Sequence, residues 1–492
     1  MTNHLYYGDN LQVLRDSIGT ESVDLVYLDP PFNSQATYNV LFKSPTGTQS
    51  QAQIEAFEDT WHRNETAEQA FDEVMQSGNG NVAEILRAMR SFLKENDMMA
   101  YLTMMAVRLL ELHRVLKPTG SLYLHCDPTA SHYLKILLDG VFGATQFRNE
   151  IVWKRTSGRK SISQFGRVHD IVFFYTKNEN ATWLAPTTPQ DEASARGHDM
   201  MTDEKGIFRV SDFSGAGAGP ARIFGERGEL HPPSGRHWMF DQEGVDCLLA
   251  EGRIIFSASG RPRLKTYLSQ LPGISVNDVW SDIEPINSAA QERLGYPTQK
   301  PLALLERIIT ASSNEGDTIL DPFCGCGTAV HAAQKLRRNW TGIDITHLAI
   351  SLIEKRLKDA FPGLAFDVHG TPTDLDGARA LATLDKYQFQ WWAVSLVDAI
   401  PYGGKKKGAD SGIDGTIYFK PDGKTTEKAI VSVKGGDNVG VPMIRDLGHV
   451  IEREKAKIGV FITLAEPTKP MQTEAIKAGF KRTTGNIQKF KF

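Results

Sequence analysis

Two short segments of this chain end an apolar run in the same way, and they constrain its fold more than any other feature. Residues 26–34 read VYLDPPFNS, and residues 319–328 read ILDPFCGCGT. A short apolar run bounded by turn residues is typical of a strand buried on both faces of a parallel sheet. Because proline fixes φ near about −65°, each Asp-Pro step makes a stiff turn at the end of its strand. The sequence therefore predicts a sheet in which two neighbouring strands end in a carboxylate.

Strands and helices are predicted to alternate around these segments. The expected elements, in chain order, are strand 22–28, helix 101–116, strand 120–127, helix 301–312, strand 318–320, a helix from about 328 and strand 340–344. The residues Lys117–Gly120 end the first of these helices. This alternation predicts an α/β fold with a doubly wound, mostly parallel sheet.

Length and composition divide the chain further. At 492 residues the chain is too long for one core, since domains average about 150 residues. Residues 178–285 are rich in Gly, Pro, Ser and Arg without periodicity, which predicts an insert between two halves of the sheet domain, 1–177 and 286–368. A compact C-terminal α/β unit is predicted at 378–492.

Charge, cysteine content and the N-terminus limit the class of protein. The formal net charge of −4 does not by itself indicate a nucleic-acid partner, so any basic surface that binds one must be local. The start of the chain lacks the layout of a signal peptide, and no apolar stretch nears the ~18 residues of a membrane span, so we expect a cytosolic protein. The four cysteines are too few and too scattered for a disulfide framework: Cys126, Cys247, Cys324 and Cys326.

The second segment has the features of a ligand-binding turn. Gly325 and Gly327 lie between a predicted strand and a predicted helix, where glycine lets the backbone approach a ligand. Asp344 ends the following strand, the position from which an acidic residue grips ribose hydroxyls in dinucleotide folds. Together they favour an adenosine-containing cofactor, with a purely structural glycine turn as the alternative.

Both segments resemble motifs of the DNA amino-methyltransferases. Residues 29–32, DPPF, resemble the catalytic motif (D/N/S)PP(Y/F), and residues 321–328 resemble the cofactor motif DPFxGxGT. The catalytic motif comes first, as in the beta class, and the order is similar to that of type III modification subunits. Further segments fit the family: GDNLQVL (8–14), AFEDTW (56–61), NEIVWKR (149–155), HDIVFFYTK (169–177) and GYPTQKP (295–301).

The resemblance implies transfer of a methyl group from S-adenosylmethionine to N6 of adenine in double-stranded DNA. Asp29 and the Pro30 carbonyl would accept the hydrogens of the amino group, Pro31 would stiffen the turn, and Phe32 would stack on a flipped base. Cytosine N4 is the alternative target. The implied cofactor-binding residues are Asp9, Thr298, Lys300, Asp321, Phe323, Gly325, Gly327, Thr328 and Asp344. For Asp9, a surface loop is the alternative interpretation.

The insert lies where this family carries its target-recognition module. Residues 153–167 hold five basic side chains, and 222–238 add Arg222, Arg227, Arg236 and Trp238, with a further basic segment at 260–268. Basic side chains gathered in one module favour phosphate contacts. We therefore expect DNA binding by this module. A homodimer and a separate restriction subunit both stay open as partners.

The C-terminal unit resembles the Mrr-like branch of the PD-(D/E)xK restriction nucleases. The resemblance places a metal-binding carboxylate at Asp414 and the catalytic lysine at Lys434. Ser432 stands where the family has Glu or Gln, and a hydroxyl is a poor ligand for Mg²⁺. Three interpretations remain: an active Mg²⁺-dependent nuclease, which would make the chain a single-chain restriction-modification enzyme, a nuclease-derived DNA-binding domain, or an unrelated fold. The expected location is the bacterial cytoplasm, in association with DNA.

Overall fold

The computed structural model describes eleven stretches of the chain: 3–31, 37–43, 49–58, 65–156, 163, 165–188, 200–271, 273–287, 290–296, 298–402 and 412–477. The chain divides into two compact units, of which one is Ala185–Asn277 and the other combines Met1–Leu184 with Asp278–Phe492. The insert predicted at 178–285 contains the smaller unit.

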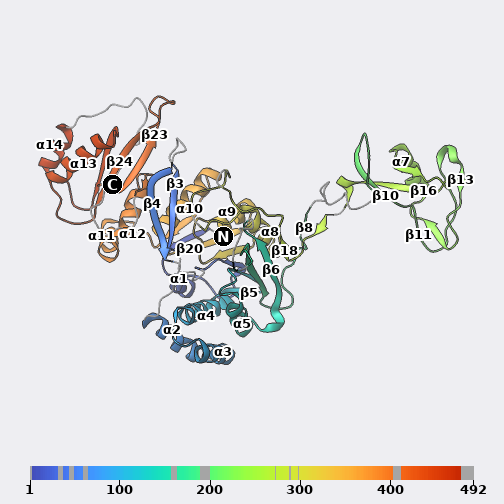
Figure 1. Ribbon diagram of the computed structural model, residues 1–492, viewed down its shortest axis with the longest axis horizontal. Coiled ribbons are helices and arrows are strands. Elements are labelled where there is room, and N and C mark those ends of the chain that lie inside the picture. The colour runs from blue at the N-terminus through green and yellow to red at the C-terminus, as the bar shows by residue number, and fades with distance from the viewer. Residues whose placement is uncertain are drawn as a thin grey trace. The chain divides into compact units, whose positions relative to one another are not determined.

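A nine-stranded sheet forms the centre of the larger unit (Figure 1). Its strands lie in the order β18 (Val279–Trp280), β6 (Phe147–Lys154), β7 (His169–Thr176), β5 (Leu116–Cys126), β2 (Val23–Leu28), β19 (Thr318–Asp321), β20 (Asn339–Asp344), β1 (His4–Tyr7) and β21 (Asp367–His369). All neighbouring pairs are parallel except the two that β7 makes. The predicted mostly parallel sheet is confirmed.

The two segments that end in Asp-Pro lie side by side. In the parallel pairing of β2 with β19, Leu25 is opposite Ile319 and Val26 is opposite Leu320. Both strands are almost completely buried, as their uninterrupted apolar sequences require. The carboxyl ends of β2 and β19 therefore meet at one edge of the sheet, as predicted.

Helices cover both faces of the sheet. They are α1 (Asn10–Ser17), α4 (Asp97–Val115), α5 (Ser131–Phe142), α8 (Leu302–Ser312), α9 (Thr328–Lys335) and α10 (His347–Ala360), while α2 (Glu65–Gln76) and α3 (Gly80–Leu93) pack on α4 and α5. Along β5, Leu122 and Leu124 belong to the core shared with α4 and α5, whereas Tyr123 bonds to Ser312 of α8. Since side chains alternate along a strand, α4 and α8 lie on opposite faces. None of the helices within the described stretches is long and apolar enough to cross a membrane.

The predicted elements of this unit agree with the structure except at the start of α4, which lies at Asp97 rather than Tyr101, and around Lys117–Gly120. The helix ends at Val115, but β5 already begins at Leu116. Val23 pairs with Leu116 and Leu25 pairs with Ser121, so the intervening residues form a bulge within the strand pairing rather than a separate turn. Strands β3 (Thr37–Lys43) and β4 (Gln49–Glu58) form an additional antiparallel hairpin.

The smaller unit is an antiparallel module with its own aromatic core. Its main sheet has the order β15 (Ile254–Phe256), β16 (Pro262–Tyr267), β10 (Gly206–Asp212) and β9 (Met200–Asp203). Helix α7 (Gln242–Ala250) accompanies short pairs of strands, β11 (Ser214–Ala216) with β14 (Arg236–Trp238) and β12 (Arg222–Ile223) with β13 (Glu229–Leu230). Strands β8 (Thr187–Thr188) and β17 (Ile274–Ser275) pair where the chain enters and leaves the module. Phe213, Phe224 and Trp238 pack edge to face in the core.

The C-terminal part has a four-stranded sheet. Its order is β22 (Ile400–Pro401), β23 (Gly415–Phe419), β24 (Glu427–Lys434) and β25 (Ile458–Thr463), with helices α11 (Leu375–Leu384), α12 (Lys386–Ser395), α13 (Val441–Arg453) and α14 (Lys469–Lys477). Helix α12 has two packing faces. Phe389 packs against β24, whereas Trp391 joins a cluster with Tyr296 and Cys326. The predicted α/β character of this part is confirmed.

Candidate active site

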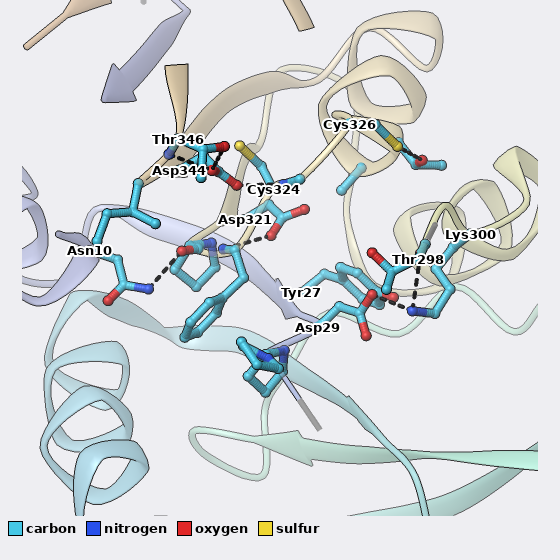
Figure 2. Close-up of a pocket in the computed structure, with 18 of the residues that line it drawn as sticks. Asn10, Tyr27, Asp29, Thr298, Lys300, Asp321, Cys324, Cys326, Asp344 and Thr346 are labelled. Atoms are coloured by element: carbon cyan, nitrogen blue, oxygen red, sulfur yellow. Dashed lines mark hydrogen bonds and ion pairs between the residues drawn. The ribbon is translucent and has the colours of Figure 1, made fainter. Parts of the chain in front are cut away.

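A cavity of about 320 Å³ opens where β1, β2, β19 and β20 end (Figure 2). Ligands of open parallel sheets bind outside the carboxyl ends of the strands, so this is the expected position for a site. Eleven of the predicted site residues line the cavity: Asp9, Asp29, Pro30, Pro31, Thr298, Lys300, Asp321, Phe323, Gly325, Thr328 and Asp344. Phe32 lies outside the described residues.

Asp344 is held by hydrogen bonds at the end of β20. Its Oδ2 accepts the Gly325 N–H at 2.9 Å, and its Oδ1 accepts both the N–H and the hydroxyl of Thr346 at 2.9 Å. Burial raises the pKa of Asp344 to about 6, although these donors oppose the shift. The carboxylate is therefore fixed in orientation and changes charge close to neutral pH.

The turn after β19 is stabilised from two sides. Asp321 Oδ1 accepts the Phe323 N–H at 3.1 Å, while the Asn10 side-chain amide donates to the Pro322 carbonyl at 2.8 Å. Burial raises the pKa of Asp321 well above its usual range. The carboxyl group of Asp321 thus belongs to the turn itself, and Gly325 supplies the backbone that faces the cavity.

The two glycines of the turn have different roles. Gly325 lines the cavity with φ of 50°, a left-handed conformation that glycine adopts without strain. Gly327 has φ of 73° and begins α9, but it is not among the residues that line the cavity. A Cβ atom at Gly327 would meet Ile353 Cγ1 at 2.7 Å. Gly327 is therefore required for packing α9 against α10. It does not line the cavity, so its role is structural.

Asp29 forms an ion pair with Lys300 across the cavity. Lys300 Nζ contacts Asp29 Oδ2, and it also donates to the Thr298 carbonyl at 3.4 Å (Figure 2). Asp29 Oδ1 is buried and has no hydrogen-bond partner among the described residues. Leaving a buried acceptor unpaired costs about 1–3 kcal/mol, so this oxygen is suited to receive a donor from a ligand.

Asp9 is a structural residue as well as part of the cavity wall. Its Oδ1 caps α1 by accepting the Leu11 N–H at 2.9 Å, and its Oδ2 pairs with Arg108 at 3.0 Å. Arg108 is fully buried in α4 and also donates to Asn10 Oδ1 at 2.6 Å. Sequence analysis missed Arg108 and Asn10. A lone arginine within the apolar sequence MMAVRLLEL was the available signal.

A buried polar chain runs behind Asp29, and sequence analysis missed it too. The Tyr27 hydroxyl lies 3.0 Å from His125 Nδ1, and His125 Nε2 lies 3.2 Å from Asp170 Oδ2. Arg155 reaches the other oxygen of Asp170 at 3.1 Å. Tyr27 lines the cavity two residues before Asp29, and burial raises its pKa well above the usual range, so its hydroxyl stays neutral. The signal was a histidine within the apolar strand LYLHC.

The proposed DNA-contacting residues of the insert are largely engaged within the module. Trp238 is 7% exposed and its indole N–H donates to the Leu230 carbonyl at 2.9 Å. The expectation that Trp238 contacts DNA is therefore wrong, because its ring fills the core of the module. Arg236 bonds to Ser214 at 2.8 Å, and Arg227 lies over the Phe256 ring at 5.0 Å. The stretch 157–162, which contains two of the five basic residues predicted beside the site, lies outside the described residues.

The second candidate site lies where β23 begins. Asp414 is buried, and its Oδ2 accepts the N–H of Val433 at 2.6 Å, which places it beside the segment between Ser432 and Lys434. Ser432 is buried as well. In the described part of the chain, no group of three His, Cys, Asp or Glu side chains forms around Asp414. The hydrogen bond places Asp414 beside strand β24, which carries Ser432 and Lys434.

A doubly wound sheet with a glycine turn facing an acidic strand end is the arrangement with which many α/β proteins bind nucleotides. The sequence model of the DNA methylase family matches residues 23–355, so the chain belongs to this family. Residues 381–485 match the model of a restriction endonuclease family. The predicted resemblances of both parts are confirmed at the level of the family.

Two relatives with similar sequences agree with this assignment. The type II methyltransferase M.EcaI of Enterobacter cloacae is 34% identical over 258 residues, which are 52% of this chain and 57% of that protein. The Mod subunit of the type III enzyme StyLTI of Salmonella typhimurium is 25% identical over 347 residues, covering 67% of this chain and 49% of that protein. The chain thus spans about half the length of these relatives. An alignment with the solved cytosine-N4-specific PvuII DNA methyltransferase has a TM-score of 0.36 at 14% identity, covering 72% of this chain and 86% of that chain.

Proposed function

We propose that this protein transfers a methyl group from S-adenosylmethionine to the exocyclic amino group of adenine in double-stranded DNA. The main support for the proposal is the position of Asp29. Its Oδ1 is buried beside the cavity without a hydrogen-bond partner among the described residues. An amino group that donates to this oxygen would satisfy it. The membership of the DNA methylase family supports DNA as the substrate.

The residues at the end of β2 suit the activation of an amino nitrogen. The lone pair of an adenine amino group is delocalised into the ring, which makes the nitrogen a poor nucleophile. Asp29 and the Pro30 carbonyl can each accept one N–H bond and draw the nitrogen toward tetrahedral geometry. Lys300 holds the other oxygen of Asp29, so the carboxylate keeps one orientation. The contribution of these residues is positioning and electrostatics.

The described residues also fit an adenosine-containing cofactor. Asp344 would accept the ribose hydroxyls, and the backbone at Phe323–Gly325 would face the methionine part, with Thr298 nearby. S-adenosylmethionine supplies a methyl group on a positively charged sulfur.

The choice of adenine N6 over cytosine N4 rests on Asp at the first position of the DPPF motif. The test is to incubate the protein with unmethylated double-stranded DNA and labelled S-adenosylmethionine, digest the DNA and separate the nucleosides. We expect N6-methyladenine. N4-methylcytosine in its place would overturn the base assignment, and no labelled nucleoside at all would overturn the methyltransferase assignment.

We assign four parts to this activity: a catalytic half at 1–177, a target-recognition module at 178–285, a cofactor-binding half at 286–368 and a nuclease-like domain at 378–492. Deleting the last part tests its role. If this part only tethers the enzyme, its loss weakens DNA binding in a salt-dependent way and leaves the methyl transfer chemistry intact.

DNA cleavage is a second candidate function, favoured by the match of residues 381–485 to a restriction endonuclease family. Asp414 would hold Mg²⁺ and Lys434 would act beside it. Unmethylated DNA incubated with the full chain and Mg²⁺ should then be cut, and Asp414→Ala and Lys434→Ala should each abolish cutting while methyl transfer persists. Intact DNA with Mg²⁺ present would eliminate this candidate for the DNA tested.

A further inference from the structure

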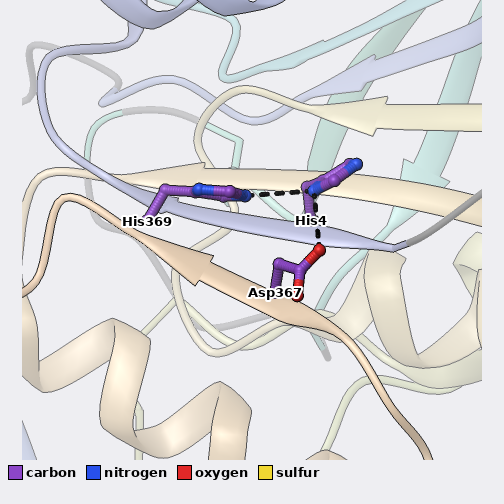
Figure 3. Close-up of side chains that lie close together, drawn as sticks. All are labelled: His4, Asp367 and His369. Carbon is purple, nitrogen blue, oxygen red and sulfur yellow. Dashed lines mark hydrogen bonds and ion pairs between the residues drawn. The ribbon is translucent and has the colours of Figure 1, made fainter.

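Three side chains capable of binding a metal converge at the edge of the central sheet, outside the lining of the cavity (Figure 3). His4 begins β1, whereas Asp367 and His369 begin and end β21. The two strands are parallel, and His4 pairs directly with Asp367. Since side chains alternate along a strand, Asp367 and His369 extend to the same face. The pairing register therefore brings two imidazoles and one carboxylate together.

The distances match those of a metal site. His4 Nδ1 lies 3.0 Å from His369 Nε2 and 3.8 Å from Asp367 Oδ2, and the ligand atoms of all three residues lie within 4.8 Å of one another. In a tetrahedral site with bonds of about 2.0–2.1 Å, neighbouring ligand atoms stand roughly 3.3–3.4 Å apart. The two separations from His4 lie on either side of that value, and small side-chain rotations would bring the three ligand atoms to a shared ion.

His369 is also oriented for binding. The Tyr6 ring stacks on His369 with centroids 4.5 Å apart and an interplanar angle of 18°, which fixes the imidazole plane.

We propose that His4, Asp367 and His369 form a binding site for a divalent transition metal of the Zn²⁺ class, with water completing the coordination. Two imidazoles and a carboxylate suit Zn²⁺, Ni²⁺ or Cu²⁺, whereas Mg²⁺ prefers oxygen ligands. Without an ion, the two imidazoles share one hydrogen bond, in which one ring nitrogen carries the proton. Binding replaces that bond with two coordinate bonds, and the proton moves to the other nitrogen of the same ring.

The site would act as a structural clip. The two histidines are 365 positions apart in the sequence, so an ion between them closes a very long loop. β1 continues into Gly8 and Asp9, which line the cavity, while β21 precedes the C-terminal part. A bound ion would therefore fix the first strand of the sheet domain to its last strand.

The test uses the full chain carrying Cys247→Ser, since Cys247 is the exposed cysteine among the described residues and would compete for metal. After treatment with a chelator, the protein is titrated with Zn²⁺ and, separately, with Co²⁺, whose visible absorption reports tetrahedral coordination. We expect one equivalent to bind and, at a hundredfold excess over Kd, a rise in Tm of about 5 °C or more. Mg²⁺ should give no such rise.

Variants locate the ion. His369→Ala should abolish stoichiometric binding, and Asp367→Asn should weaken it at least tenfold without disturbing the fold, because the Asp367 side chain is 59% exposed. His132→Ala, which removes an exposed histidine of α5, is the matched control and should bind normally. Stoichiometric binding that survives in His369→Ala, or no binding by the parent chain, would overturn the proposal.

Discussion

Two carboxylates of this protein, Asp29 and Asp414, occupy similar positions at strand ends but have different surroundings. Asp29 lines a cavity, pairs with Lys300 through one oxygen and keeps the other oxygen buried without a partner among the described residues. Asp414 is buried too, yet its Oδ2 accepts the backbone N–H of Val433 at 2.6 Å. The first carboxylate is ready to bind a ligand, whereas the second already supports the pairing of its own sheet.

This difference shows that a sequence motif does not determine whether its carboxylate can bind a ligand. The sequence offers an aspartate and a lysine at each site, Asp29 with Lys300 and Asp414 with Lys434. A carboxylate contributes to catalysis only when the fold directs a free acceptor toward space that a substrate can enter. By this criterion Asp29, which lines the cavity, is better placed than Asp414 to contact a substrate.

The largest expected effect comes from removing the carboxylate itself. Asp29→Ala should lower the rate of methyl transfer by about 10³-fold, because both the charge and the acceptor for the amino group are lost. The Kd for S-adenosylmethionine should change by less than about twofold, since Asp344 is intact. Single-turnover transfer and calorimetric titration measure the two quantities. An active Asp29→Ala enzyme would show that Asp29 is not the acceptor for the amino group.

Lys300 should have a smaller effect on the same step. Lys300→Met removes the ion pair that orients Asp29, and we expect kcat to fall by about 10²-fold with a nearly unchanged cofactor Kd. Lys300→Arg, which keeps the charge but changes the geometry, should retain part of the activity. If the cofactor Kd rises and kcat does not fall, Lys300 serves the cofactor, as its motif suggested, rather than Asp29.

The raised pKa of Asp344 predicts that the Kd of the cofactor depends on pH. A protonated carboxyl cannot accept both ribose hydroxyls, and the pKa of Asp344 is about 6. The cofactor Kd should therefore be constant above neutral pH and rise by up to about tenfold per unit as the pH falls below 6. Asp344→Asn should bind more weakly and lose this dependence. A wild-type Kd that stays flat between pH 7 and 5 would contradict the proposed role.

The smallest expected effect concerns the stability of the C-terminal part. Asp414→Ala leaves the buried Val433 N–H without its acceptor, which should cost about 1–3 kcal/mol of unfolding free energy. Denaturant unfolding of the full chain, followed by a probe in the C-terminal part, measures this change. Ser432→Ala is a suitable control. An unchanged free energy of unfolding would show that the hydrogen bond from Val433 to Asp414 does not stabilise the sheet. Asp414 would then resemble Asp29 in having an oxygen available for a ligand.

Much of the site was predictable because the motifs are local. Asp29, Asp321 and Asp344 were each placed at a strand end from the adjoining apolar residues alone. Residues whose roles depend on packing were harder to assign. Trp238 stands beside an arginine-rich segment and looked like a surface residue, yet it fills a core. Arg108 is a charge within an apolar helix, and its partner Asp9 is 99 positions away.

The sequence by itself determined the alternation of strands and helices around the two turns that end in Asp-Pro, and it placed both turns at strand ends. Hydrophobic periodicity and turn chemistry depend on residues that are close in the sequence, so they can be recognised without a structure. Only the tertiary structure decided which side chains meet. Lys300 reaches Asp29 across 271 positions, and His369 reaches His4 across 365. A parallel sheet brings such distant segments together, and side-chain orientation depends on the packing that results.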